Sequence, residues 1–229
     1  MKALASVEAI YSSTDKVRST MNHPEKRYFE KDRLQALSDG VFSIVMTLLV
    51  LNLIDIDVLG AKTEGELHQL LSALWPKLVS YIISFVIAAR FWVAQHVLTH
   101  NITQIDLRFI WLNALFLFFI SMLPFSAALL GEHHQYAVAE IVYGANMIMS
   151  VGTLGVCWRY AVADGCLVKD DLPPEFSRVA YSRIRMAVVV YAIGIVISIA
   201  NPHAGYVMYV LAAFLSILLV TIGKRSIPI

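Results

Sequence analysis

The chain has 229 residues and a mass of 25.5 kDa, and 58% of its residues are hydrophobic while 15% are charged. A soluble domain contains about 45–50% apolar and about 25% charged residues, so this composition and the mean hydropathy of +0.67 indicate a polytopic membrane protein. The formal net charge of +1 and the two cysteines exclude a nucleic-acid binder built on a basic surface and a disulfide scaffold.

Residues 1–32 are polar and lack the apolar stretch of a signal peptide, so we interpret them as a cytoplasmic N-terminal tail. Six hydrophobic segments follow, each near the ~20 residues that cross ~30 Å of hydrocarbon. They cover about residues 34–54, 78–98, 107–130, 138–162, 186–200 and 206–222. Their lengths favour helices over barrel strands. The sequence therefore predicts an all-α membrane protein with six transmembrane helices in residues 33–223, then a cytoplasmic tail at residues 224–229.

Lysine and arginine are distributed unevenly over the predicted connections. If the N-terminus lies inside, almost all of them fall on the inner side, whereas the outer side carries Lys62 and Lys77, and Arg90 lies within a helix. Basic residues are enriched on the cytoplasmic side of membrane proteins. We therefore expect both termini in the cytoplasm, an even number of spans and a location in the plasma membrane. Four spans followed by a re-entrant pair remains an open alternative. Pro124 is expected to kink the third segment.

The first hydrophobic segment is short. The charge-free stretch between Asp39 and Asp55 holds 15 residues, which cover roughly 22 Å of helix. Ser38 and Asp39 should therefore lie at the edge of the hydrocarbon, where a carboxylate needs hydrogen-bond donors. Candidate donors in the sequence are Arg33, Arg90, Trp92, His96 and Asn113.

A helical wheel separates two faces of this segment. Ile44, Leu48 and Leu51 form one stripe, with Thr47 at its margin and Asp55 at its outer end. The same wheel places Ser38 and Asp39 on the other side of the helix. A stripe of Ile and Leu is, by spacing alone, more typical of helix packing or lipid contact than of a functional surface.

Three blocks of the sequence resemble one known family. The stretch RLQALSDGVFSIVMTLLVLNL at residues 33–53 is similar to the signature of the transmembrane protein 175 family of potassium channels, whose first helix carries R-x-x-x-F-S-D. The stretches SYIISFVIAARFWVAQHVL and LNALFLFFISMLPF resemble the second and third helices of that family. Two positions depart from its pattern: Leu37 replaces the motif phenylalanine, and Gln95-His96 replaces a His-His pair, which argues against a proton-linked role for Gln95.

The resemblance implies a fold and a function. Prokaryotic members have one six-helix repeat per chain and assemble as homotetramers around a pore that the first helix lines. By that likeness the narrowest ring is Ile44, further hydrophobic rings are Leu48 and Leu51, and Thr47 contributes to selectivity. We expect a potassium-selective leak-type channel whose partners are its own copies, the lipid bilayer and potassium ions. Potassium is the permeant ion, and no cofactor, structural metal or nucleic acid is expected.

The resemblance also suggests roles for the polar residues. Arg33, Ser38, Asp39, Trp92 and His96 are expected to form a network that holds the first helix and affects gating. Two further acids, Asp55 and Asp57, are expected at the outer mouth, where they raise the local cation concentration, although acids that simply end a helix are equally common there.

The chain carries no Walker, G-x-S-x-G or H-E-x-x-H motif, so we do not expect an enzyme. The rival function is a small secondary transporter or a proton-conducting membrane protein in which Asp39 and His96 titrate.

Overall fold

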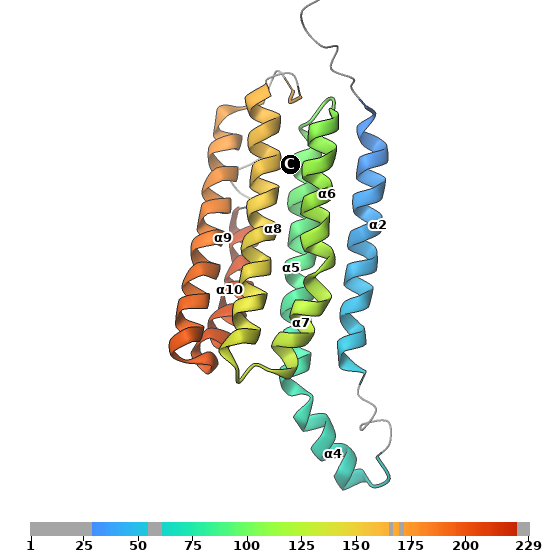
Figure 1. Cartoon of the computed structure of the whole chain (residues 1–229), viewed down its shortest axis with the longest axis vertical. Coiled ribbons are helices and arrows are strands. Elements are labelled where there is room, and N and C mark those ends of the chain that lie inside the picture. Colours follow the sequence, from blue (N-terminus) through green and yellow to red (C-terminus); the bar gives the residue numbers. More distant parts are fainter. Residues whose placement is uncertain (1–28, 55–60, 165–166, 170–171, 224–229) are drawn as a thin grey trace, which may run out of the picture.

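The computed structural model describes residues 29–54, 61–164, 167–169 and 172–223 (Figure 1). The predicted tails, apart from residues 29–32, and the two acids Asp55 and Asp57 lie outside the described residues. The regular elements in the described part of the chain are helices. In chain order they are α2 (Lys31–Leu49), η1 (Val50–Leu53), α4 (Glu64–Ala73), α5 (Trp75–His100), α6 (Leu107–Ser121), α7 (Leu123–Glu132), α8 (Ala137–Asp164), α9 (Pro174–Ala200) and α10 (Pro202–Gly223).

Within the described residues, five helical segments are long and apolar enough to cross a membrane. They are Lys31–Leu53, Trp75–His100, Leu107–Glu132, Ala137–Ala163 and Pro174–Ala200. These segments contain the first five predicted spans, so the all-helical membrane architecture is confirmed. The sixth predicted span lies on α10, which is not one of these five segments, and the count of six spans stays a prediction.

The helix boundaries show where hydropathy alone misleads. The third span consists of α6 and α7, with a break at Met122, as expected from Pro124 in the first turn of α7. The fifth helix begins at Pro174, well before the apolar segment at residues 186–200. Proline is favoured in the first turn of a helix. The part of α9 that precedes the apolar segment contains several arginines, so hydropathy does not reveal it. Helix α4 was not predicted; Thr63 caps it by accepting a hydrogen bond from the Glu66 N–H at 3.2 Å.

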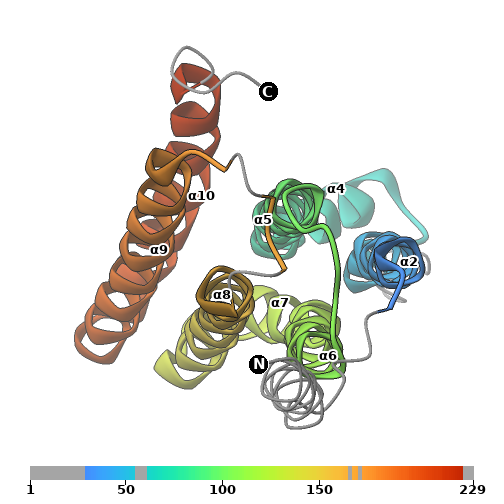
Figure 2. The same ribbon diagram turned by 90° about the horizontal axis from the view of Figure 1, so that it is seen from above.

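The helices form a bundle in which α2 lies at one edge, beside α5 and α6, while α9 and α10 form the opposite edge (Figure 2). Helix α4 extends beyond the lower end of the bundle in Figure 1. The core next to α2 is aromatic: the ring of Phe116 lies 6.1 Å from Phe42 and 6.0 Å from Phe91. This packing buries one side of α2 and leaves the other side outside the bundle.

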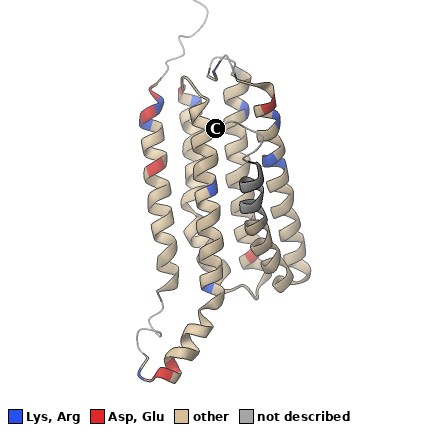
Figure 3. Cartoon of the chain, turned by 180° about the vertical axis from the view of Figure 1, so that it is seen from behind, with Lys and Arg blue, Asp and Glu red and all other residues tan. Residues whose placement is uncertain are grey.

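Backbone hydrogen bonds join three connections at one end of the bundle. Phe29 N–H donates to Ile105 O at 2.8 Å, and Thr103 N–H donates to Leu167 O at 2.8 Å. The start of α2, the α5–α6 loop and the α8–α9 loop are thereby tied together. Lysine and arginine are concentrated toward this end (Figure 3). Those in or next to these connections are Lys31, Arg33, Arg108, Arg159, Lys169 and Arg178.

Candidate functional site

A buried polar cluster joins α2 to α5 and α6. Ser38 on α2 is fully buried, and its hydroxyl donates to Leu34 O at 2.9 Å. The same oxygen accepts hydrogen bonds from Gln95 Nε2 on α5 at 2.8 Å and from Asn113 Nδ2 on α6 at 3.2 Å. One hydroxyl group therefore links three helices. Its hydrogen is donated to one acceptor, and its oxygen accepts two hydrogen bonds.

Asp39 lies beside this cluster and is only partly buried. Its Oδ1 accepts a hydrogen bond from Trp92 Nε1 on α5 at 2.8 Å. One turn further along α5, His96 Nδ1 lies 2.7 Å from Gln35 Nε2, and the Gln35 amide oxygen accepts from Thr99 Oγ1 at 2.8 Å. The structure thus places Ser38, Asp39, Trp92 and His96 close together, and His96 binds Gln35 and not Asp39.

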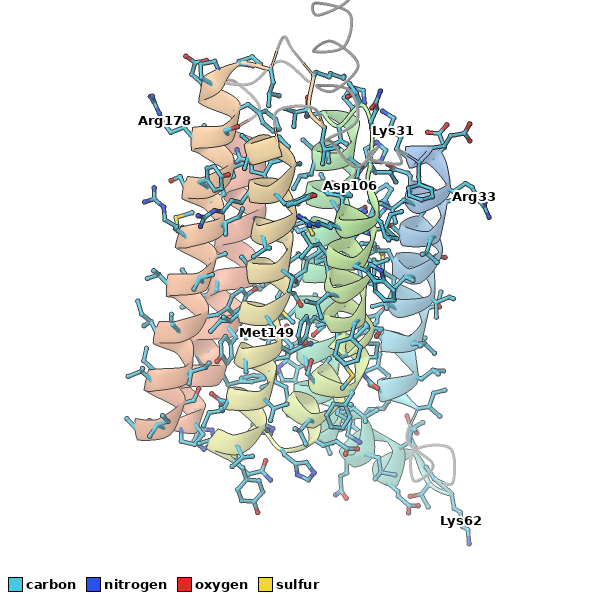
Figure 4. The ribbon with its side chains drawn as sticks, turned by 45° about the horizontal axis from the view of Figure 1, so that its top comes forward. Lys31, Arg33, Lys62, Asp106, Met149 and Arg178 are labelled. Atoms are coloured by element: carbon cyan, nitrogen blue, oxygen red, sulfur yellow. The ribbon has the colours of Figure 1, made fainter. Side chains whose placement is uncertain are left out.

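Two predicted donors lie away from the cluster. Arg33 is exposed in the first turn of α2, and its side chain is directed away from the bundle (Figure 4). No hydrogen bond or ion pair recorded among the described residues joins Arg33 to Asp39. Arg90 on α5 lies near Tyr191 and Arg183 on α9. Arg90 and Trp92 are two positions apart on a helix, which places their side chains on different faces.

Sequence reasoning missed Gln35, Gln95 and Thr99 as members of the cluster. Gln95 and Thr99 are one turn apart, and Thr99 is three positions from His96, so a wheel of α5 would have grouped them. Gln35 is four positions before Asp39 on α2 and shares its face for the same reason. The spacing of the polar residues in these two apolar helices therefore indicates which side chains share a face with the cluster.

The outer end of α2 has its own anchor. Asn52 in η1 donates from Nδ2 to the carbonyl oxygen of Pro124 on α7 at 3.1 Å. The polar cluster holds the other end of the helix. Because α2 is hydrogen-bonded to its neighbours near both ends, its rotation about its own axis is fixed.

This rotation exposes the apolar stripe. Ile44 is 59% exposed and Leu51 is 51% exposed, whereas Phe42 on the opposite side is 1% exposed. The other exposed positions on the same side of the helix are Leu37, Gly40, Thr47 and Leu48. The division of the wheel into a stripe and a buried polar side therefore agrees with the burial of these residues in the protomer.

Thr47 has its hydroxyl hydrogen engaged within the helix. Its Oγ1 lies 2.8 Å from Ile44 O and 3.1 Å from Ser43 O, both of which accept only. The hydroxyl oxygen keeps its lone pairs free from this donation, on the exposed side of α2. Such an oxygen suits a cation better than an anion.

Comparison with known proteins relates this arrangement to one family. The family described as endosomal/lysosomal potassium channel TMEM175 matches residues 33–124, the segment that contains the whole polar cluster. A protein of Streptomyces collinus named a potassium channel is 32% identical over 162 residues, which cover 69% of this chain and 76% of that protein. A chicken (Gallus gallus) protein named endosomal/lysosomal proton channel TMEM175 is 35% identical over 116 residues, which cover 48% of this chain and 23% of that protein.

A solved structure shows the same fold. The crystal structure of a lysosomal potassium-selective channel TMEM175 homolog from Chamaesiphon minutus superposes with a TM-score of 0.70 at 23% identity. The superposition covers 82% of this chain and 96% of that chain. The identity over three quarters of the Streptomyces relative and the match of residues 33–124 agree with the resemblance seen in the sequence, and the family consists of channels and not of enzymes. The chain belongs to the TMEM175 family of potassium channels.

Proposed function

We propose that this chain forms a potassium-selective leak-type channel in which four copies surround a pore lined by α2. The observation that carries the proposal is the exposed apolar stripe on a helix whose rotation is fixed at both ends. Within the described residues, one protomer encloses packed apolar side chains, so a water-filled path needs several copies. The potassium-channel names of the Streptomyces and Chamaesiphon relatives support the choice of ion.

In this assembly Ile44 forms the narrowest ring, with Leu48 and Leu51 one and two turns further along. Apolar rings of this kind control conduction by excluding water from a narrow neck. A potassium ion gives up hydration water more readily than a sodium ion, so the same neck favours potassium without a cage of carbonyl groups. The lone pairs of Thr47 offer partial coordination next to the neck.

The polar cluster supplies rigidity instead of ion binding. Ser38, Asp39, Trp92 and His96 face the bundle or its edge, away from Ile44, and hold α2 at one depth and rotation. Arg33 lies at the same end of α2 and faces away from the bundle, so its role in gating needs a partner on another copy. Asp55 and Asp57 follow the pore helix in the chain, and we assign them to the outer mouth.

The charge distribution supports an orientation. The end of the bundle that carries most lysines and arginines is the cytoplasmic end by the positive-inside rule. With α10 as a sixth span, residues 33–223 form the channel domain and both tails, 1–32 and 224–229, lie in the cytoplasm of a cell bounded by the plasma membrane.

The test is an electrical recording of the purified protein in a bilayer with unequal potassium on the two sides. We expect unitary currents that reverse near the potassium equilibrium potential. Ile44→Asn should enlarge the current and weaken the preference for potassium over sodium, because it places a polar group in the neck. Ile193→Asn is the matched control, since Ile193 is 47% exposed on α9, and α9 lies at the opposite edge of the bundle from α2 (Figure 2).

Equal effects of the two substitutions would contradict the assignment of α2 to the pore. A purified protein that is monomeric by light scattering would contradict it as well. The rival function, proton conduction or coupled transport through Asp39 and His96, draws on the proton-channel name of the vertebrate relatives. It predicts that the reversal potential follows a pH gradient. The geometry disfavours it, because His96 contacts Gln35 and Asp39 accepts from Trp92, so no hydrogen bond recorded among the described residues joins the two proposed proton carriers.

A further inference from the structure

A fully buried acid lies at the junction of α8, α9 and α10, on the side of the molecule opposite to α2. Glu140, in the first turn of α8, has no exposed surface, and Oε2 of its carboxyl group contacts the hydroxyl of Ser198 on α9. Gly205 on α10 makes room for both groups, since a Cβ at this position would overlap the carboxyl oxygen and the hydroxyl. Tyr209 on α10 donates to the backbone oxygen of Glu140 at 3.2 Å.

The one hydrogen of Ser198 does not suffice for both of its contacts if the Glu140 carboxyl group is ionised. The oxygen of Ser198 contacts two groups, Glu140 Oε2 and Gly194 O, the latter at 2.8 Å. A carbonyl oxygen and a carboxylate both accept only, and a serine has one hydrogen to donate. If Glu140 carries a proton, it donates to Ser198, which then donates to Gly194 O, and both contacts are satisfied.

The second carboxyl oxygen also indicates that the carboxyl group of Glu140 is neutral. Glu140 Oε1 is buried and has no hydrogen-bond partner. An unpartnered oxygen costs more free energy in a charged carboxylate than in the carbonyl of a neutral acid. Asp106, the other deeply buried acid among the described residues, differs in this respect: Phe109 N–H donates to its Oδ1 and Tyr160 donates to its Oδ2.

The groups that face Glu140 offer weak compensation for a negative charge. His203 and the backbone of Tyr206, both on α10, lie near the carboxyl group. His134, in the α7–α8 loop, lies against Tyr206 with ring centres 5.5 Å apart. Nearby in the fold, Lys77 on α5 and Glu132 on α7 form an ion pair with each other at 3.0 Å. The helix N-termini of α8 and α10 favour an anion, but by less than burial of an unpaired charge costs.

We propose that Glu140 is a proton-binding site, neutral at physiological pH, whose bound proton latches the α9–α10 hairpin to α8. The nearby His203 is exposed, so the junction lies close to solvent. When the proton leaves, Ser198 faces two acceptors with one hydrogen and the junction loosens. Because the native state holds a proton that an exposed glutamate releases, stability decreases as the pH rises above the range where exposed glutamates lose their protons. This proposal does not depend on which ion the pore conducts.

Infrared spectroscopy of the purified channel tests the site directly. The C=O stretching band of a protonated carboxyl group should be present at neutral pH and should disappear in Glu140→Gln. Glu132→Gln, which removes an exposed glutamate at the same end of the bundle, should keep the band. Absence of the band in the unaltered protein, or its survival in Glu140→Gln, overturns the proposal.

Should Glu140→Gln not assemble, isotope labelling of the glutamate carboxyl carbon in the unaltered protein gives the assignment, because labelling shifts the band only if it belongs to a glutamate. The other described glutamates are all exposed: Glu30, Glu64, Glu66, Glu132 and Glu175. The melting temperature of the unaltered protein should fall as the pH rises, and that of Glu140→Gln should fall much less. Identical pH profiles for the two proteins contradict the latch.

Discussion

Two polar regions of this chain are buried in apolar surroundings and balance their hydrogen bonds differently. The cluster that holds α2 consists of neutral amides and a hydroxyl, in which Ser38 accepts two hydrogen bonds and donates one. Its one acid, Asp39, stays partly exposed beside a single indole donor. The junction around Glu140 buries an acid completely and offers it too few donors. The hydrogen bonds of Ser38 are thus complete with neutral partners. The proposed site at the periphery needs a bound proton to complete its own.

The largest effect is expected from Ser38→Val. Valine removes the shared oxygen, so Gln95 and Asn113 each lose an acceptor inside the protein. An orphaned buried donor costs about 1–3 kcal/mol, so the loss should be about 2–6 kcal/mol and lower the melting temperature of the purified channel clearly. Ser43→Val is the matched control, because Ser43 is an exposed serine on the same helix. Equal melting temperatures for the two variants would show that the cluster does not hold α2.

A smaller loss is expected from Gly205→Ala at the other region. The added methyl group would overlap the Glu140 carboxyl group and lie 2.9 Å from Cα of Ser198, so α10 must move away from α9. Overpacking of this kind costs about 1–3 kcal/mol. Gly152→Ala on α8 is the control, since nothing lies within 4 Å of its added Cβ. Thermal unfolding in detergent compares the two, and a Gly205→Ala protein as stable as the control would mean that the junction is loosely packed.

The two regions also differ in how far the sequence predicts them. The pattern of 3.6 residues per turn placed Ser38 opposite Ile44, and the few polar residues in apolar segments pointed to Trp92 and Asn113 as partners. Partners that depend on the rotation of two helices at once, such as Asn52 with Pro124, did not follow from one segment. Neither did the burial of Glu140, because an acid in the first turn of a helix is ordinarily a favourable, solvated residue.

The long-range arrangement was missed for related reasons. Hydropathy located the apolar part of α9 but not its charged first turns, because a helix that leaves the membrane continues in water as long as its residues favour the helix. Helix α4 depends on its Thr63 cap and on continuity with α5, and neither feature raises hydropathy. The sequence therefore predicts the individual helices well, but it predicts the contacts between helices poorly.

The smallest effect is expected at Thr47, where the same counting of hydrogens applies to an exposed group. Its hydrogen is used within α2, so the hydroxyl presents lone pairs to the proposed pore. Thr47→Val keeps the shape and removes the oxygen. Losing one weak oxygen contact should reduce the preference for potassium by about 0.5–1 kcal/mol, a roughly two- to five-fold change in the permeability ratio. Reversal potentials with potassium on one side of the bilayer and sodium on the other measure this ratio.

Thr153→Val is the matched control for this measurement. Thr153 on α8 makes the same bonds within its helix, to Met149 O at 2.7 Å and to Ser150 O at 3.1 Å, but α8 does not border the exposed side of α2 (Figure 2). Removing its oxygen should leave the reversal potential unchanged. If both variants change the permeability ratio alike, selectivity does not arise at the α2 stripe. If neither does, the apolar ring at Ile44 accounts for selectivity without help from a hydroxyl, and Thr47 only completes the surface of the helix.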